Sequence, residues 1–180
     1  MAQKGIRLSW VTVIAITVGV GGLSAGERQE ALENFQDVNA SLCRGAQPSE
    51  NGLRELAKLG VHTVVDLRGG AGRSSKEAEL VRSLGMTYVN VPLDGYQAPS
   101  SLELSKVMAV LNDPNSGKVF VHCRRGADRT GTILAVYRME HDHWSNQQAL
   151  DEAKSMKMAA SERLMQKFVL DFTPAVLAGN

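Results

Sequence analysis

The spacing of hydrophobic residues changes along this chain, and the changes predict strands that alternate with helices. Nearly continuous apolar runs at residues 61–67, 86–91 and 119–122 are typical of strands that are covered on both faces. A shorter strand that runs into a turn is expected within residues 41–48. Between these runs, apolar residues recur at intervals of three and four, as on one face of a helix. The alternation indicates an α/β fold with a mainly parallel central sheet flanked by helices.

Local signals mark where the helices begin and end. Pro48 and Ser49 predict a helix that continues to about residue 59, where Gly60 ends it. The helix that follows residue 130 is apolar nearly all round and should be central and buried. Other helices are expected to begin at capping boxes, in which a serine and a residue three positions later bond each other's backbone. These pairs are Ser74 with Glu77, Ser100 with Glu103, and Ser145 with Gln148. A last helix is expected to carry Leu164, Phe168 and Phe172 on one face and to end at Pro174.

The first 25 residues differ in kind from the rest. Lys4 and Arg7 precede an apolar run, and small residues follow up to Ala25, as in a secretory signal peptide. An uncleaved membrane anchor is the alternative, since a bilayer span needs about 20 apolar residues. Glycines in the run favour cleavage. Either arrangement places the folded domain, residues 26–180, in an exported protein, which would be periplasmic in a Gram-negative bacterium.

Composition and charge exclude several classes of protein. With 43% hydrophobic and 22% charged residues, the chain is globular and not disordered. A net charge of +1 excludes a generally basic nucleic-acid-binding protein, so no nucleic-acid partner is expected. A membrane partner is expected only if the N-terminal segment is uncleaved.

The stretch from Val119 to Gly131 carries the candidate chemistry. An apolar strand ends at Cys123, a short loop containing Gly126 follows, and Arg129 opens the buried helix. The N–H groups of such a loop and of a helix start can converge on one anion. This field favours a thiolate and moves a cysteine pKa from about 8.5 to roughly 3.5–7.5. Arg129 can add a bidentate contact to phosphate oxygens.

The sequence His122-Cys123, five residues, then Arg129-Thr130-Gly131 resembles the signature loop of the cysteine-dependent protein tyrosine and dual-specificity phosphatases. A rhodanese-type sulfurtransferase loop is the alternative, but the offset of six residues from cysteine to arginine argues against it. The short chain favours the dual-specificity type, in particular its exported bacterial members. The turn at residues 44–48 also resembles a segment of that bacterial branch.

The resemblance implies a protein-tyrosine-phosphatase-like fold and a metal-independent hydrolase without a cofactor. Such an enzyme dephosphorylates proteins at phosphotyrosine, with serine and threonine as further targets, and we expect it to be a monomer. Cys123 would attack phosphorus to form a phosphocysteine intermediate. Asp94, 29 residues earlier on the loop after a strand, would be the general acid and then the base. Thr130 would donate a hydrogen bond to the departing sulfur, His122 would orient the loop, and the phosphate would be bound by Arg124, Arg125, Gly126, Ala127, Asp128 and Arg129.

Some assignments stay open at this point. Asp128 is a rival acid, because lipid-directed relatives carry an acidic residue before the loop arginine; otherwise it caps the next helix or balances Arg129. Arg124 and Arg125 would suit a substrate with several phosphates, so a phosphoinositide or inositol-phosphate phosphatase is the alternative function. A silent phosphate-binding module is disfavoured, because Cys123, Arg129 and Asp94 are all present.

Two further features are expected to be structural. Cys43 and Cys123 in an exported protein suggest a disulfide, but a permanent bond would block the nucleophile. We therefore favour Cys43 as a packing residue and leave a reversible, protective bond open. The tripeptide His141-Asp142-His143 is expected to be a polar turn, since no further zinc ligands accompany it.

Overall fold

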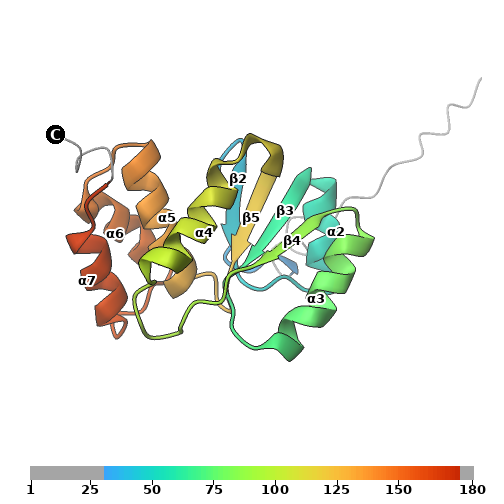
Figure 1. Cartoon of the computed structure of the whole chain (residues 1–180), viewed down its shortest axis with the longest axis horizontal. Coiled ribbons are helices and arrows are strands. Elements are labelled where there is room, and N and C mark those ends of the chain that lie inside the picture. The colour runs from blue at the N-terminus through green and yellow to red at the C-terminus, as the bar shows by residue number, and fades with distance from the viewer. Residues whose placement is uncertain (1–30, 175–180) are drawn as a thin grey trace, which may run out of the picture.

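A five-stranded sheet lies between two layers of helices in the computed structural model of the chain, which describes residues 31–174 apart from the side chains of residues 71–73 (Figure 1). The strand order is β1-β2-β5-β3-β4. This confirms the predicted α/β fold. The strands are β1 (Gln36–Asn39), β2 (Leu42–Gly45), β3 (Val61–Asp66), β4 (Thr87–Asn90) and β5 (Lys118–His122).

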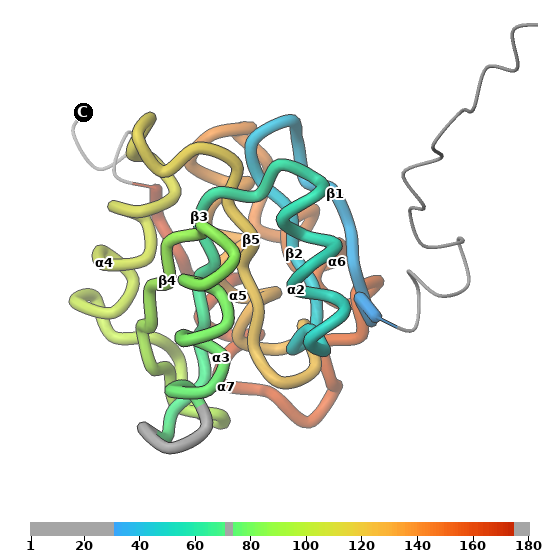
Figure 2. The backbone as a smooth tube through the Cα atoms, turned by 90° about the vertical axis from the view of Figure 1, so that its right-hand side faces the viewer, coloured from blue at the N-terminus to red at the C-terminus, as the bar shows by residue number. Residues whose placement is uncertain are grey.

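Four of the strands run parallel, and only β1 pairs antiparallel, with β2. β5 is central, and its last residue, His122, lies opposite Gly45 of β2 and Asp66 of β3. The loops that follow these three strands therefore meet at one edge of the sheet, where α/β proteins bind ligands (Figure 2). The strand β1 was not predicted, because its four residues mix polar and apolar positions.

The two helical layers bury opposite faces of the sheet. Helices α2 (Glu50–Lys58) and α3 (Ala71–Ser83) cover one face, and α4 to α7 cover the other (Figure 1). Side chains alternate along β5, so Phe120 packs toward α2 and α3 while Val121 packs toward α4 to α7. The second layer consists of α4 (Ser101–Asn112), α5 (Asp128–His141), α6 (Asn146–Ser155) and α7 (Arg163–Asp171), and the short 3-10 helix η1 (Pro114–Ser116) precedes β5.

The capping signals are confirmed at three helices and wrong at one. Ser49 caps α2, and the capping boxes of α4 and α6 form as predicted. Ser74 and Glu77 do not cap α3, which begins at Ala71. Both side chains turn instead into a buried polar cluster, so their spacing reflects that cluster and not a helix start.

Helix α7 packs against the core mainly through residues adjacent to the three that the spacing predicted. Met165 and Val169 are its buried residues, whereas Leu164 is half exposed. Phe168 and Phe172 are partly buried against the core. The helix ends at Asp171, before the expected stop at Pro174.

The proposed signal segment, residues 1–25, lies outside the described residues. Within residues 31–174, no helix combines the length and the apolar character needed to cross a membrane. The two cysteines are unbonded and face opposite sides of the sheet: Cys43 packs toward α2 and α3, and Cys123 toward α4 to α7. A disulfide needs Cβ atoms about 3.5–4.5 Å apart, so the Cys43–Cys123 bond does not form in this fold.

Candidate active site

Cys123 sits at the base of a cavity of about 900 Å³ at the carboxyl edge of the sheet. It directly follows β5, and α5 begins at Asp128, so residues 124–127 form the connecting loop. The cysteine is buried, with 2% of its surface exposed. The cavity is lined by Cys123, Arg124, Arg125, Asp128 and Arg129 of the signature stretch, by Gln47, Arg68 and Gly69 from the turns after β2 and β3, and by Gly95, Tyr96 and Glu162.

The predicted phosphate-binding residues differ in their burial and in whether they line the cavity. Arg129 lines the cavity, and its Nη1 lies 3.5 Å from the Leu67 carbonyl oxygen, to which it donates. Arg124 and Arg125 line the cavity too, but both side chains are exposed. Gly126 and Ala127 are buried and do not line the cavity. Both arginines at the rim are therefore exposed where a substrate would extend beyond the reacting phosphate, although Arg125 also pairs with Asp128.

Asp128 is a structural tether. One carboxylate oxygen accepts from Arg125 at 2.7 Å, and the other accepts from the Ala159 N–H at 2.9 Å. It makes no capping bond to α5. The expectation that Asp128 balances Arg129 is therefore wrong in its partner, which is Arg125, and both of its oxygens are engaged.

The candidate acid Asp94 lies at the cavity mouth with its carboxylate turned to its own loop. Oδ1 accepts from the N–H groups of Tyr96 at 2.7 Å and Gln97 at 2.9 Å. Asp94 is exposed and does not line the cavity, although Gly95 and Tyr96 do. The structure thus brings the acid loop to the site but not the acid itself into contact with Cys123.

Two side chains lie beneath the loop. Thr130 is fully buried, and its hydroxyl has no hydrogen-bond partner among the described residues. It is available to the sulfur, and its predicted role stays a prediction. His122 is also fully buried, and its Nδ1 lies 3.2 Å from the Cys123 carbonyl oxygen. Because a carbonyl oxygen only accepts, Nδ1 is the donor in this contact.

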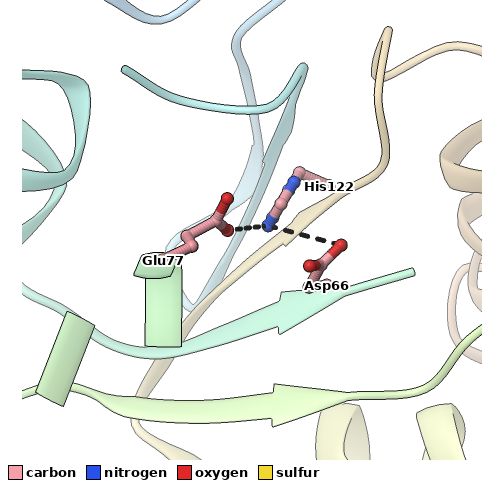
Figure 3. Close-up of side chains that lie close together, drawn as sticks. All are labelled: Asp66, Glu77 and His122. Atoms are coloured by element: carbon pink, nitrogen blue, oxygen red, sulfur yellow. Dashed lines mark ion pairs between the residues drawn. The ribbon is translucent and has the colours of Figure 1, made fainter. Parts of the chain in front are cut away.

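Figure 3 shows part of the buried polar cluster that surrounds His122. His122 Nε2 lies 2.8 Å from Glu77 Oε1 and 3.9 Å from Asp66 Oδ1. Arg68 joins both carboxylates, donating to Asp66 at 2.7 Å and to Glu77 at 2.6 Å. Tyr88 and Ser74 complete the cluster by donating to Asp66. The cluster connects the cavity wall, through Arg68, to the residue that precedes Cys123.

Burial opposes ionisation of Asp66, but hydrogen bonds from Arg68 and the proximity of His122 outweigh it and hold the pKa of this carboxyl below its usual range. Burial by itself would lower the pKa of Arg68, but its hydrogen bond to Asp66 and the nearby charge of Glu77 raise it. Asp66, Glu77 and His122 lie close enough together to suggest metal ligands. The guanidinium of Arg68 bridges Asp66 Oδ2 and Glu77 Oε2, so one oxygen of each carboxylate is already engaged by a cation.

The turn after β2 supports the loop from behind. Gly126 has a positive φ of 65°, and a Cβ atom there would lie 2.3 Å from the backbone of Gly45. The Gln47 N–H donates to the Arg124 carbonyl oxygen at 3.3 Å. Gly131 allows α5 to approach Ala153 of α6 and Met158 closely.

The sequence patterns did not reveal the role of two features: Arg68 in the cavity wall, and the turn at residues 44–48 that supports the loop. Arg68 follows the predicted strand at residues 61–67, and no local pattern marks it, although an aspartate two residues before an arginine at a buried strand end can signal an ion pair. The turn at residues 44–48 was noted without a role. The predicted polar turn is confirmed: His141 bonds Asn112, and Asp142 pairs with Arg138.

Comparisons with known proteins agree with this geometry. A family model described as a DSP-PTPase phosphatase fused to NAD+ kinase matches residues 15–171. Mouse dual specificity protein phosphatase 26 is 27% identical over 150 residues, covering 78% of this chain and 69% of that protein. Dual specificity protein phosphatase TpbA of Pseudomonas aeruginosa is 29% identical over 119 residues, covering 66% of this chain and 52% of that protein.

Solved structures show the same fold. The catalytic core of the PP-IP phosphatase SIW14 from S. cerevisiae has a TM-score of 0.72 at 22% identity, covering 82% of this chain and 90% of that one. A variant of P. aeruginosa TpbA in complex with phosphotyrosine has a TM-score of 0.68 at 21% identity, covering 82% and 91%. Since the family model spans most of the chain, the protein belongs to the DSP-PTPase family of cysteine-based dual-specificity phosphatases and is a hydrolase.

Proposed function

We propose that this phosphatase hydrolyses phosphotyrosine, and other phosphate monoesters in proteins, through a phosphocysteine intermediate at Cys123. The observation that carries the proposal is the position of Cys123 at the base of the cavity, beneath a loop and the start of α5, with Arg129 beside it. A nucleophile, an anion-binding loop and a bidentate cation are thus present in one place.

The first step would be attack of the Cys123 thiolate on phosphorus, in line with the ester oxygen. The S–P bond forms as the P–O bond breaks, and the leaving oxygen takes a proton from Asp94. Loop N–H groups and Arg129 stabilise the charge on the equatorial oxygens. In the second step, water attacks the phosphocysteine, Asp94 takes its proton, and the thiolate leaves with a hydrogen bond from Thr130. No metal is needed for either step.

This role requires Asp94 to move. Its Oδ1 is held by the Tyr96 and Gln97 N–H groups, and the side chain does not line the cavity. A change of rotamer, or a closing movement of the loop at residues 94–97, would bring the carboxyl to the leaving group. Lid movements of this kind are common in enzymes. We propose that substrate binding favours this movement, with Tyr96, which is 75% exposed, as the residue that meets the substrate.

Protein phosphotyrosine is supported by the phosphotyrosine complex of TpbA. Inositol phosphates are the second candidate, and a specific observation favours them. Arg124 and Arg125 are exposed at the rim of the cavity, where they could contact further phosphates, and SIW14 is a PP-IP phosphatase. We further propose that the enzyme is exported and acts as a monomer, on the ground of the N-terminal segment and the sequence resemblance.

A comparison of substrates tests the proposal. Protein lacking residues 1–25 is assayed with phosphotyrosyl peptides, phosphoseryl peptides and inositol phosphates, in a chelator and a reductant. We expect the highest kcat/KM with phosphotyrosyl peptides and a trapped phosphocysteine after rapid acid quench. A preference for inositol phosphates would select the second candidate, and loss of activity in the chelator would contradict the mechanism.

A further inference from the structure

The carbonyl oxygens of residues 123–126, in the signature loop, are engaged by groups from outside this stretch. The Cys123 oxygen lies 3.2 Å from His122 Nδ1, and the Arg124 oxygen accepts from the Gln47 N–H at 3.3 Å. The Arg125 oxygen accepts from Asn34 Nδ2 at 3.2 Å. The Gly126 oxygen accepts twice, from Asn34 Nδ2 at 3.1 Å and from Arg44 Nη2 at 2.7 Å. Neither Asn34 nor Arg44 lines the cavity.

These bonds determine where the loop N–H groups point. In a planar trans peptide the C=O of one residue and the N–H of the next point in opposite directions. A carbonyl held toward the back of the loop therefore turns the following N–H toward the front. The N–H groups of Arg124 to Ala127 donate to no acceptor within residues 31–174. They are available to an anion in the cavity.

Arg44 is an unusual residue for this position. It is 1% exposed, and its Nε and Nη1 atoms have no hydrogen-bond partner in the described part of the chain. Burial lowers the pKa of Arg44 to about 10, so the guanidinium keeps its charge at neutral pH. An incompletely bonded buried cation costs stability. Its single bond, to Gly126, lies directly behind the signature loop.

Asn34 has a comparable place in the turn that precedes β1. Its φ is 52°, a left-handed conformation that asparagine tolerates better than most residues. Its amide also donates to the Met156 carbonyl oxygen at 3.2 Å, at the end of α6. A purely structural role, fastening the end of α6 to the turn before β1, is therefore the competing explanation for Asn34.

We infer that Asn34 and Arg44 are positioning residues for catalysis, which hold the Arg125 and Gly126 carbonyls away from the cavity and so aim the N–H groups of Gly126 and Ala127 at the phosphate. The identity of the anion rests on the proposed function. Neither residue touches the substrate. They act through two peptide units, and their loss should weaken the binding of any tetrahedral oxyanion.

Tungstate binding to a Cys123→Ser background tests this inference without turnover. Arg44→Met and Asn34→Gly are added singly, and calorimetry measures the affinity for tungstate. Methionine matches the length of the arginine stem, and glycine accepts the left-handed backbone. We expect affinity to fall about 10- to 100-fold in each, because the N–H donors are misaimed but not removed, whereas removal of an oxyanion donor costs about 10²–10³-fold in kcat. With Cys123 intact, kcat/KM for p-nitrophenyl phosphate should fall in parallel.

Melting temperature separates positioning from a structural role. Arg44→Met removes a poorly bonded buried charge and should leave the melting temperature unchanged or higher, while affinity falls. Asn146→Ala is the matched control for Asn34. Asn146 Nδ2 also donates to two carbonyls, of Val169 and Phe172, but at the other end of α6. It should lower the melting temperature and leave tungstate affinity within about twofold.

Three results would count against these expectations in different ways. Tungstate affinity within about twofold of the background in both Arg44→Met and Asn34→Gly would overturn the inference alone. Affinity that follows the melting temperature across all variants, Asn146→Ala included, would make the role structural and would also overturn it. Failure of the Cys123→Ser background itself to bind tungstate or inorganic phosphate would overturn the proposed function, and the inference with it.

Discussion

Replacing Asp66 by asparagine should destabilise the protein more than any other single substitution at the site. Oδ1 of Asp66 accepts from the N–H and Nε of Arg68, both at 2.8 Å, and Oδ2 accepts from Arg68 Nη2 at 2.7 Å and Tyr88 at 2.6 Å. Asparagine is isosteric, but its NH2 group would face the donors on the Oδ2 side. The change also leaves Arg68, itself 6% exposed, with Glu77 as the remaining carboxylate that balances its charge.

The size of the effect follows from this burial. Removing one partner of a buried ion pair costs about 3–5 kcal/mol. At about 2–4 °C per kcal/mol for a domain of this size, the melting temperature should fall by roughly 6–20 °C. The matched control is Asp37→Asn. Asp37 is 59% exposed and pairs with Lys118 on the surface, so its loss should cost at most about 1 kcal/mol.

The pH dependence has a defined sign. The pKa of Asp66 is lower in the folded protein than in the unfolded chain. Its stabilising contribution is therefore complete above the ordinary aspartate range, about pH 4, and is lost as pH falls through the folded pKa. The gap in melting temperature between wild type and Asp66→Asn should be largest near pH 7 and should narrow in acid. Differential scanning calorimetry from pH 3 to pH 8 measures it, and an equal gap at every pH, or no gap, would refute the reasoning.

Three other predictions concern the reaction. Cys123→Ser should abolish turnover but keep oxyanion binding, whereas Arg129→Lys should lose the bidentate contact and most activity; substantial turnover by Cys123→Ser would exclude Cys123 as the nucleophile. Asp94→Asn should slow the hydrolysis of tyrosyl and alkyl phosphates by about 10²–10⁴-fold, spare that of activated aryl phosphates and remove the basic limb of the pH–rate profile. Asp128→Asn should change the rate little, and the change should not depend on the leaving group. The reverse pattern in steady-state kinetics would make Asp128 the acid. Burial raises the pKa of the Cys43 thiol to about 12, and Cys43 faces away from Cys123. After treatment with peroxide, wild type and Cys43→Ser should therefore recover equal activity when thiol is added. Poorer recovery of activity by the variant would show that a protective bond forms after rearrangement.

Local signals predicted the elements of this fold well, because helix caps and apolar runs depend on residues that are neighbours in the chain. Ser100 with Glu103 and the run at residues 119–122 both gave the observed elements. The same rule failed at Ser74 and Glu77, which have the spacing of a capping box but are turned inward by Asp66 and Arg68. The pattern alone cannot distinguish these outcomes, since the deciding partners lie on a strand elsewhere in the sequence.

The candidate site shows the same division. The signature from His122 to Gly131 identified the cysteine, the arginine and the buried helix, because these lie within one strand–loop–helix unit. Asn34 and Arg44 could not be found this way. Their partners are carbonyl oxygens, which every residue carries, so no residue type in the signature indicates that a donor is required behind it.

The contact between Gly45 and Gly126 limits how far the signature can be separated from its surroundings. The two glycines meet backbone to backbone, so a side chain at Gly126 would collide with main-chain atoms that have no rotamer to change. The curvature of the loop thus depends on two segments that are distant in the sequence, the end of β2 at Gly45 and the loop at Gly126. A transplant of residues 119–131 onto another strand–helix unit would carry the nucleophile and the arginine without the hairpin that shapes the loop. Grafting residues 34–45, which include Asn34 and the β1–β2 hairpin, together with the signature would be the smallest transfer expected to preserve an anion-binding cradle.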